Sequence, residues 1–172
     1  MSCCIILGSS NPRGNTYHVV QKMFSPLPDL YCLSDYKIGH YDYQGKNETD
    51  DFLPLIKKLL LYSVWIFATP VYWYSMSGLL KVFFDRFTDL ISCHKEIVNN
   101  LKGKTTFLVC TSSSGKPETF ESPIAETFSY LGMVYDGCCD LIGEAHPQSV
   151  EHNPVQLSKG QDWFAKQQCH NT

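Results

Sequence analysis

The chain has few basic residues and no cluster of them. Only two of its 172 residues are arginine, and the formal net charge is −3 at pH 7. Proteins that bind nucleic acid usually carry a basic patch or stripe that neutralises phosphate groups. We therefore expect no nucleic acid among the partners of this protein.

Long hydrophobic runs are absent as well. The longest apolar runs are far shorter than the roughly 20 residues that a helix needs to span a bilayer. The first residues also lack the basic start, apolar centre and small-residue cleavage site of a secretory signal. We expect a soluble, cytoplasmic protein with no membrane partner.

Metal-binding and disulfide patterns are missing, although cysteine is frequent. The eight cysteines include no C-x-x-C pair, and no histidine spacing resembles that of a zinc site. Several cysteines fall inside apolar segments, where cysteine commonly serves as a small buried hydrophobe. Without a secretory signal, disulfides are not expected either. We predict no metal site and regard most of the cysteines as structural.

The remaining composition is that of a folded chain. Hydrophobic residues make up 44% and charged residues 18% of the sequence, so a core can form and long disordered segments are not expected. A length of 172 residues is typical of one domain. No internal repeat, low-complexity tract or linker divides the sequence. We expect a single domain over residues 1–172.

Short apolar runs alternate with segments of helical periodicity. Strands are predicted at 3–7, 30–33, 63–68, 105–110 and 137–142. Helices are predicted at 15–24, from Asp50 or Asp51 onward, at 79–91, 118–131 and 154–168. Such alternation gives parallel strands joined by crossover helices. We therefore predict an α/β fold: a flavodoxin-like, doubly wound sheet of five parallel strands with helices on both faces.

A polar loop, residues 8–16, joins the first predicted strand to the first predicted helix. A helix N-terminus favours anions, and Gly14 lets the backbone approach one closely. Five residues separate Gly8 from Gly14 and no lysine follows, so neither the triphosphate loop nor the dinucleotide fingerprint matches. We predict a monophosphate held without metal; the alternative is a polar turn that only caps the helix. The expected phosphate-binding residues are Ser9, Ser10, Arg13, Asn15 and Thr16.

Two further loops follow predicted strands at the same edge of the sheet, where doubly wound folds bind their ligands. Residues 69–78 are rich in aromatic side chains, and Pro70, Val71, Tyr72 and Trp73 are expected to lie against a flat ring. Taken alone, this cluster could equally contact a protein partner. The third loop is expected to meet the polar edge of such a ring through Thr111, Ser112, Ser113 and Gly115. A phosphate and a flat ring together predict flavin mononucleotide (FMN).

These segments resemble the NADPH-dependent FMN reductase family of NAD(P)H-dependent flavin oxidoreductases. The resemblance rests on Gly8-Ser9-Ser10 through Gly14-Asn15-Thr16, Thr69-Pro70-Val71-Tyr72-Trp73, Ser77-Gly78-Leu79-Leu80-Lys81 and Phe84-Asp85-Arg86. It covers nearly the whole chain in order and spacing. It implies a flavodoxin-like fold, bound FMN, and reduction of quinones, free flavins or azo dyes by NADH or NADPH. It also implies a homodimer or homotetramer with FMN near the subunit interface.

One branch of that family carries an iron–sulfur cluster on a compact cysteine motif after the second strand. The equivalent stretch here, residues 38–45, contains no cysteine, so we expect no iron–sulfur cluster. Hydride transfer is chemistry of the cofactor itself, and no catalytic residue is predicted. Asp85 and Arg86 are expected to form structural charge pairs, and His146 is expected to be a solvated loop histidine.

The predicted helix at 79–91 has apolar residues on more than one side. One face must pack on the sheet, and the surplus predicts a second buried face and hence a dimer. The alternative is that the polar connection that follows covers this helix within the chain.

We therefore predict an FMN-dependent NAD(P)H oxidoreductase with ping-pong kinetics. Two alternatives stay open: a flavodoxin-type FMN electron carrier, and a non-enzymatic binding module. The sequence does not decide between NADPH and NADH. Lys116 is a candidate for the extra phosphate of NADPH by its place alone.

Overall fold

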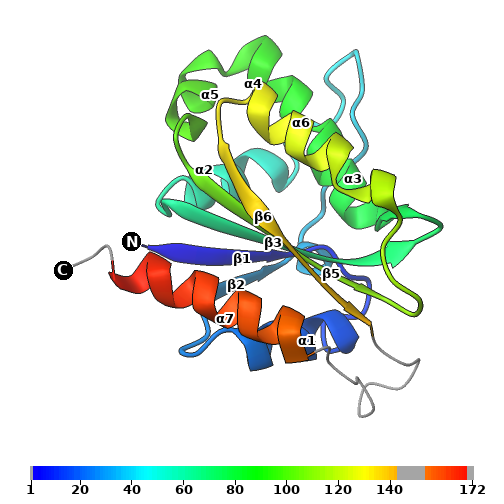
Figure 1. Ribbon diagram of the computed structural model, residues 1–172. Coiled ribbons are helices and arrows are strands. Elements are labelled where there is room, and N and C mark those ends of the chain that lie inside the picture. Colours follow the sequence, from blue (N-terminus) through cyan, green and yellow to red (C-terminus); the bar gives the residue numbers. More distant parts are fainter. Residues whose placement is uncertain (1, 143–153, 170–172) are drawn as a thin grey trace.

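Five apolar segments form one parallel sheet in the computed structural model, which describes residues 2–142 and 154–169. The strand order is β2-β1-β3-β5-β6 (Figure 1). A two-residue strand, β4 (Ser75–Met76), pairs antiparallel with the end of β3. The prediction of a five-stranded, doubly wound α/β sheet is confirmed. The parallel strands are β1 (Cys3–Leu7), β2 (Asp29–Cys32), β3 (Val64–Tyr72), β5 (Thr105–Ser112) and β6 (Val134–Ile142).

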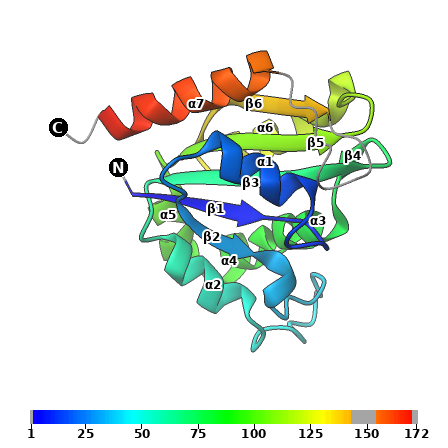
Figure 2. The ribbon, with the colours of Figure 1, turned by 90° about the horizontal axis from the view of Figure 1, so that it is seen from below.

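The helices cover both faces of this sheet, as Figures 1 and 2 show. On one face lie α1 (Asn15–Met23) and α7 (Pro154–Cys169). On the other lie α2 (Phe52–Leu59), α3 (Gly78–Asp85), α4 (Phe87–Cys93), α5 (Lys95–Leu101) and α6 (Ser122–Tyr130). None of the helices in the described ranges is long and apolar enough to cross a membrane.

The central strands are mainly apolar because both of their faces are covered. Ile66 of β3 pairs with Ile5 of β1 on one side and with Phe107 of β5 on the other, and all three side chains are buried. Complete burial of a large aliphatic or aromatic side chain contributes about 1.5–3 kcal/mol. Chain order reverses between β1 and β3, which creates the switch point where doubly wound folds bind ligands.

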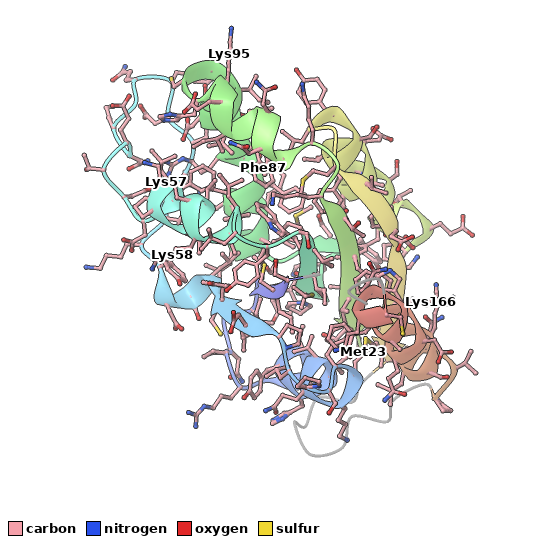
Figure 3. The ribbon with its side chains drawn as sticks, turned by 90° about the vertical axis from the view of Figure 1, so that its left-hand side faces the viewer. Met23, Lys57, Lys58, Phe87, Lys95 and Lys166 are labelled. Atoms are coloured by element: carbon pink, nitrogen blue, oxygen red, sulfur yellow. The ribbon has the colours of Figure 1, made fainter. Side chains whose placement is uncertain are left out.

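Two side-chain layers fill the space between sheet and helices. Met23 of α1 packs against Gly160 of α7, where a Cβ atom would collide with the methionine side chain. On the opposite face Phe87 lies in an aromatic cluster, with its ring 5.3 Å from that of Phe83 and 5.4 Å from that of Phe84. Figure 3 labels Met23 and Phe87 inside the molecule and several exposed lysines, Lys57, Lys58, Lys95 and Lys166, on its outside.

The apolar residues of segment 79–91 pack mainly within the chain. Leu80, Phe83, Phe84, Phe87 and Leu90 are buried. The remaining members, Leu79, Val82 and Ile91, are partly buried. The sequence argument for a partner on this segment therefore loses its basis, because other elements of the same chain already cover it.

Three strands are longer than predicted: β6 begins at Val134 and not at Gly137, and both β3 and β5 extend at their carboxyl ends. β3 continues through Pro70 to Tyr72, and β5 continues through Thr111 to Ser112, so these positions are strand and not loop. The extension arises from long-range pairing, since Pro70 pairs with Thr111. Proline is tolerated here because β1 pairs with β3 only as far as Ala68, so its missing N–H removes no ladder bond on that side.

The predicted helix at 79–91 is also interrupted. It forms two helices, α3 and α4, joined at Arg86, and the unpredicted helix α5 follows. The Arg86 side chain turns inward, where it forms ion pairs with Asp50 and with Asp89 and donates to the Gly39 carbonyl at 3.0 Å. This buried network joins the 36–51 connection to the helices, so the expectation of a structural charge pair at Arg86 agrees with its contacts. Asp85 pairs instead with Lys81 at the surface.

Candidate functional site

A cavity of about 360 Å³ lies at the carboxyl ends of β1, β3 and β5. This volume falls within the range of about 300–1,000 Å³ found for small-ligand sites. Its walls come from three segments that are distant in sequence but adjacent at the switch point. The cavity brings together most of the predicted site residues, namely Ser9, Asn15, Thr16, Pro70, Val71, Tyr72, Thr111, Ser112 and Ser113.

Two larger hollows lie elsewhere. One, of about 870 Å³, lies between α7 and β6, and the other, of about 640 Å³, lies beside residues 41–48 and α4. Neither lies at the switch point of the sheet, where doubly wound folds bind their ligands. Size alone is therefore a poor guide here, and the smaller cavity is the candidate site.

The first two walls are joined by Ser77. Its hydroxyl group donates to the Gly8 carbonyl and accepts the Leu80 N–H at 3.2 Å, which makes Ser77 the N-cap of α3. The Ser77 N–H donates in turn to the Thr69 hydroxyl at 3.1 Å. A Cβ atom on Gly8 would lie only 2.7 Å from the Leu80 Cβ. Glycine at position 8 thus lets α3 pack directly on the end of β1.

The loop after β1 is held in shape by its own hydrogen bonds. The Ser9 hydroxyl donates to the Asn11 carbonyl at 3.0 Å and accepts the Asn11 N–H at 3.3 Å. The Asn11 side chain accepts the Arg13 N–H at 3.2 Å, and the Gly14 N–H donates to the Asn11 carbonyl at 3.1 Å. The single proton of the Ser9 hydroxyl is therefore engaged inside the loop, so Ser9 shapes the loop more than it offers a donor.

The start of α1 has the properties of an anion site. Its N-cap is Gly14, which has no side chain to cap the first turn, and no acidic residue lies in that turn. The N-terminal N–H groups and the helix dipole therefore face the cavity without a competing carboxylate. Asn15 and Thr16 line the cavity at this point, as the sequence predicts.

The third wall is fixed to the first by two threonines. The hydroxyl groups of Thr16 and Thr111 lie 2.7 Å apart, and both residues are buried. One proton lies between the two oxygens, so the second hydroxyl proton remains available for a ligand.

Loop 112–116 rests on Asp140 of β6. The Asp140 carboxylate accepts the Lys116 N–H at 2.7 Å and the Ser112 hydroxyl at 3.3 Å. The Gly115 N–H donates to the Ser112 oxygen at 2.9 Å, and Gly115 has a φ of +95°, a conformation that favours glycine. Gly115 thus shapes the loop but does not line the cavity.

The Lys116 side chain is already paired. Its ammonium group lies 2.7 Å from a Glu121 carboxylate oxygen, and the Tyr135 hydroxyl donates to the other oxygen at 2.6 Å. The hydrogen bond with Glu121 raises the pKa of Lys116, while burial opposes the rise. The charge of Lys116 is therefore balanced by Glu121 within the protein.

An exposed aromatic turn borders the cavity. Trp73 and Tyr74 join β3 to β4 with φ values of 49° and 67°, which are left-handed and unusual for aromatic residues. Tight hairpins of this kind normally use Asn-Gly. The exposed fractions are 50% for Tyr72, 94% for Trp73 and 76% for Tyr74. Tyr72 lines the cavity, whereas Trp73 is not among its lining residues.

Two other predicted residues, Ser10 and Arg13, are exposed and are not part of the cavity lining. Sequence reasoning missed Asn11, which lines the cavity, and Asp140, which supports loop 112–116. Asn11 precedes a proline, a common turn signal that could have identified it. Asp140 lies within an apolar strand sequence that gives no such signal. His146 lies outside the described residues.

The cysteines contribute no metal site in the part of the chain that the structure describes, where no group of His, Cys, Asp or Glu could hold a metal ion. Burial raises the pKa of Cys3 and of Cys139 to about 12, so both remain protonated thiols. Such thiols are weak nucleophiles, which agrees with a structural role.

The cavity suits FMN in its chemistry. Its lining residues include no charged side chain, and they combine hydroxyl and amide groups with an apolar wall of Pro70, Val71 and Tyr72. The helix N-terminus matches a phosphate group, and the apolar wall matches a flat ring.

Comparison with known proteins identifies the family. The family model of NADPH-dependent FMN reductases matches residues 1–137. A Bacillus subtilis relative, YwqN, named provisionally as an NAD(P)H-dependent FMN-containing oxidoreductase, is 28% identical over 159 residues, which cover 85% of this chain and 86% of the relative.

Two solved structures share the fold. The Trp repressor binding protein from Bacillus subtilis has a TM-score of 0.75 and 21% identity, over 92% of this chain and 95% of its own. General stress protein 14 from Treponema denticola, in complex with FMN, has a TM-score of 0.66 and 14% identity. The match covers 96% of this chain and 99% of that protein's chain. With the family model matching most of its length, the chain belongs to the NADPH-dependent FMN reductase family.

Proposed function

We propose that this FMN-dependent NAD(P)H oxidoreductase passes electrons to a quinone, a flavin or a similar small aromatic acceptor, and that the whole chain acts as one FMN-binding domain. The observation that carries the proposal is the cavity itself. An uncharged set of donors at the N-terminus of α1 lies beside an apolar wall at the switch point of the sheet.

Three segments would hold the cofactor. The N–H groups at the start of α1, with the Asn15 amide and the Thr16 hydroxyl, would bind the phosphate, and Arg13 would add its charge from the rim. Pro70, Val71 and Tyr72 would lie against the ring. The backbone of 111–115 and the Ser113 hydroxyl would meet its polar edge. When bound, FMN supplies a ring that accepts hydride from NAD(P)H and passes the electrons on.

The choice of acceptor is supported by the exposed aromatic turn. Tyr72, Trp73 and Tyr74 offer flat apolar surfaces next to the cavity, and such surfaces bind planar aromatic molecules by stacking. They carry no charge that would select one acceptor over another. We therefore propose a broad range of planar acceptors.

The same turn supports an oligomer. Three neighbouring aromatic side chains with exposed fractions of 50% or more are unusual on a monomer surface. We propose that the turn, and not the segment 79–91, contacts a second copy in a homodimer or homotetramer. Sedimentation of the wild type and of Trp73→Ser tests this. A dimer that weakens in the variant supports the contact, and an equally stable dimer rules it out.

The decisive experiment is the visible spectrum of the purified protein with added FMN, before and after addition of NADPH or NADH without oxygen. We expect bound oxidised flavin that bleaches on addition of nicotinamide, followed by parallel lines in steady-state kinetics. Bound flavin that does not bleach would indicate an electron carrier. A protein that takes up no flavin would be a binding module.

A further inference from the structure

The Asp140 carboxylate lies directly behind the third wall of the cavity. It sits on β6, paired in register with Cys110 of β5. One carboxylate oxygen accepts the Lys116 N–H at 2.7 Å. The other accepts the Ser112 hydroxyl at 3.3 Å and faces the Cys110 thiol at 3.5 Å. Donors from both ends of loop 112–116 therefore converge on one side chain.

All of these donors are neutral. No ion pair to Asp140 occurs among residues 2–142 and 154–169, and the nearby Lys116 ammonium pairs with Glu121 instead. Hydrogen bonds to an ionised acceptor are roughly twice as strong as those between neutral groups. Because two of its three donors belong to loop 112–116, the Asp140 carboxylate acts on the shape of that loop.

Ser112 transmits this constraint to the cavity. Its hydroxyl proton goes to Asp140, which leaves its oxygen to accept the Gly115 N–H at 2.9 Å. Ser112 also lines the cavity, together with Ser113. Removal of the carboxylate would leave both the Ser112 hydroxyl and the Lys116 N–H without their acceptor. The hydrogen bond from the Gly115 N–H to Ser112 would then no longer be fixed, and Gly115 would not be held at its φ of +95°.

We infer that Asp140 is a positioning residue for the flavin ring: it holds loop 112–116 in the shape that receives the polar edge of the ring. This inference rests on the proposed function, since it assumes that the cavity binds FMN. Asp140 itself would not touch the cofactor, because it is absent from the cavity lining.

The test compares Asp140→Ala with Asp136→Ala. Asp136 is a matched control because it lies on the same strand, accepts the Trp163 indole N–H at 2.5 Å and is remote from the loop. In the flavin-free protein we expect the Gly115 and Lys116 amides of Asp140→Ala to exchange hydrogen at least tenfold faster. Exchange there should not change in Asp136→Ala.

Binding supplies the second readout. Fluorescence titration should show dissociation constants for FMN and for riboflavin that rise together, by about ten- to a hundredfold, in Asp140→Ala. We expect the affinity for the two ligands to fall in parallel, because the effect lies at the edge of the ring, which both ligands share. If Asp140→Ala does not fold, Asp140→Asn serves instead. It preserves the shape of the side chain but cannot accept both sets of donors, and we expect both dissociation constants to rise at least threefold.

The outcomes separate the two proposals. If amide hydrogen exchange in loop 112–116 is unchanged in Asp140→Ala, the positioning role of Asp140 is overturned. It is also overturned if the variant loses affinity for FMN alone and binds riboflavin normally. Failure of the wild type to bind either flavin overturns the proposed function instead. In that case the exchange measurement still shows whether Asp140 holds the loop.

Discussion

The buried hydroxyl groups of Thr16 and Thr111 meet at 2.7 Å across 95 residues of sequence. This contact joins the first turn of α1 to the end of β5. Both residues line the cavity, so the contact fixes its first wall against its third. The two threonines therefore couple the stability of the fold to the shape of the site.

Thr16→Val and Thr111→Val should each destabilise the flavin-free protein by about 1–2 kcal/mol, because each leaves one buried hydroxyl without its partner. The double variant should cost little more than either single variant, since both polar groups are then gone. Urea unfolding of all four proteins gives the coupling energy. Strictly additive losses would show that the two hydroxyl groups do not depend on each other.

Two glycines near α3 should respond in opposite ways to alanine. Gly8→Ala places a Cβ atom 2.7 Å from that of Leu80, and we expect a loss of about 2–3 kcal/mol from overpacking. In Gly78→Ala the added Cβ atom has no neighbour within 4 Å, and we expect the free energy of unfolding to rise by up to about 1 kcal/mol. Thermal and urea unfolding measure both. Equal effects would contradict the close approach of α3 to β1.

Asn15→Asp adds a carboxylate at the proposed phosphate site with almost no change in shape. We expect FMN binding to weaken by about ten- to a hundredfold through charge repulsion, whereas riboflavin, which has no phosphate, should bind as before. Folding should not suffer, since an acidic residue suits a helix N-terminus. Asn99→Asp on the exposed face of α5 is the charge control. An equal loss for both flavins would place the phosphate elsewhere.

Replacement of the Trp73-Tyr74 turn by Asn-Gly should stabilise the protein by about 1–2 kcal/mol, because these residues adopt left-handed backbone angles readily. The melting temperature should rise by roughly 3–6 °C. Tyr43→Asn is the control, since Tyr43 is 93% exposed but has no left-handed φ, and its effect should stay within about 0.5 kcal/mol. If the turn binds acceptors, the stabilised variant should reduce them more slowly.

The Arg86 network should make stability depend on pH in the acid range. Burial acts to raise the pKa of Asp50, but hydrogen bonds from Arg86 and from the Phe52 and Gly39 N–H groups outweigh it and lower the pKa. The contribution of Asp50 is therefore complete above about pH 4 and is lost as the pH falls through the lowered value. Asp50→Asn should lower the free energy of unfolding by about 3 kcal/mol at neutral pH.

Urea unfolding at several pH values tests this, because the difference between wild type and Asp50→Asn should narrow below about pH 4. A constant difference would contradict it. Asp85→Asn in the exposed pair with Lys81 should change stability by about 0.5 kcal/mol or less at every pH.

The sequence predicts the number of parallel strands and their approximate positions, because the apolar run of each strand is a local signal. It does not predict where β3 ends, since its extension to Tyr72 depends on pairing with β5. It also misses the break at Arg86, where a charged side chain turns inward to meet Asp50, 36 residues away. Both errors arise where distant contacts outweigh local preference.

The candidate site is predictable to the extent that it consists of loops after strands. Residues of the Ser9–Thr16 segment and of the β3 end line one cavity because parallel strands end at one edge. The hydrogen-bond partners of individual side chains are not predictable in this way. Ser9 lies in a polar loop and Ser112 at the end of β5, yet the protons of both hydroxyl groups are engaged, by Asn11 and by Asp140. Such assignments depend on partners that the local sequence does not reveal.

The assembly of the cavity from the ends of β1, β3 and β5 has a consequence for biosynthesis. At about 5–20 residues per second, Thr111 is synthesised roughly 5–20 s after Thr16. During the later part of that interval, after Tyr72 has been made, the nascent chain holds the first two walls without the third. A partial chain therefore offers no complete receptor for FMN, and the cofactor would be acquired late, by a nearly finished polypeptide. Supply of FMN would then influence how much finished protein survives, because a ligand that binds only the folded state stabilises it.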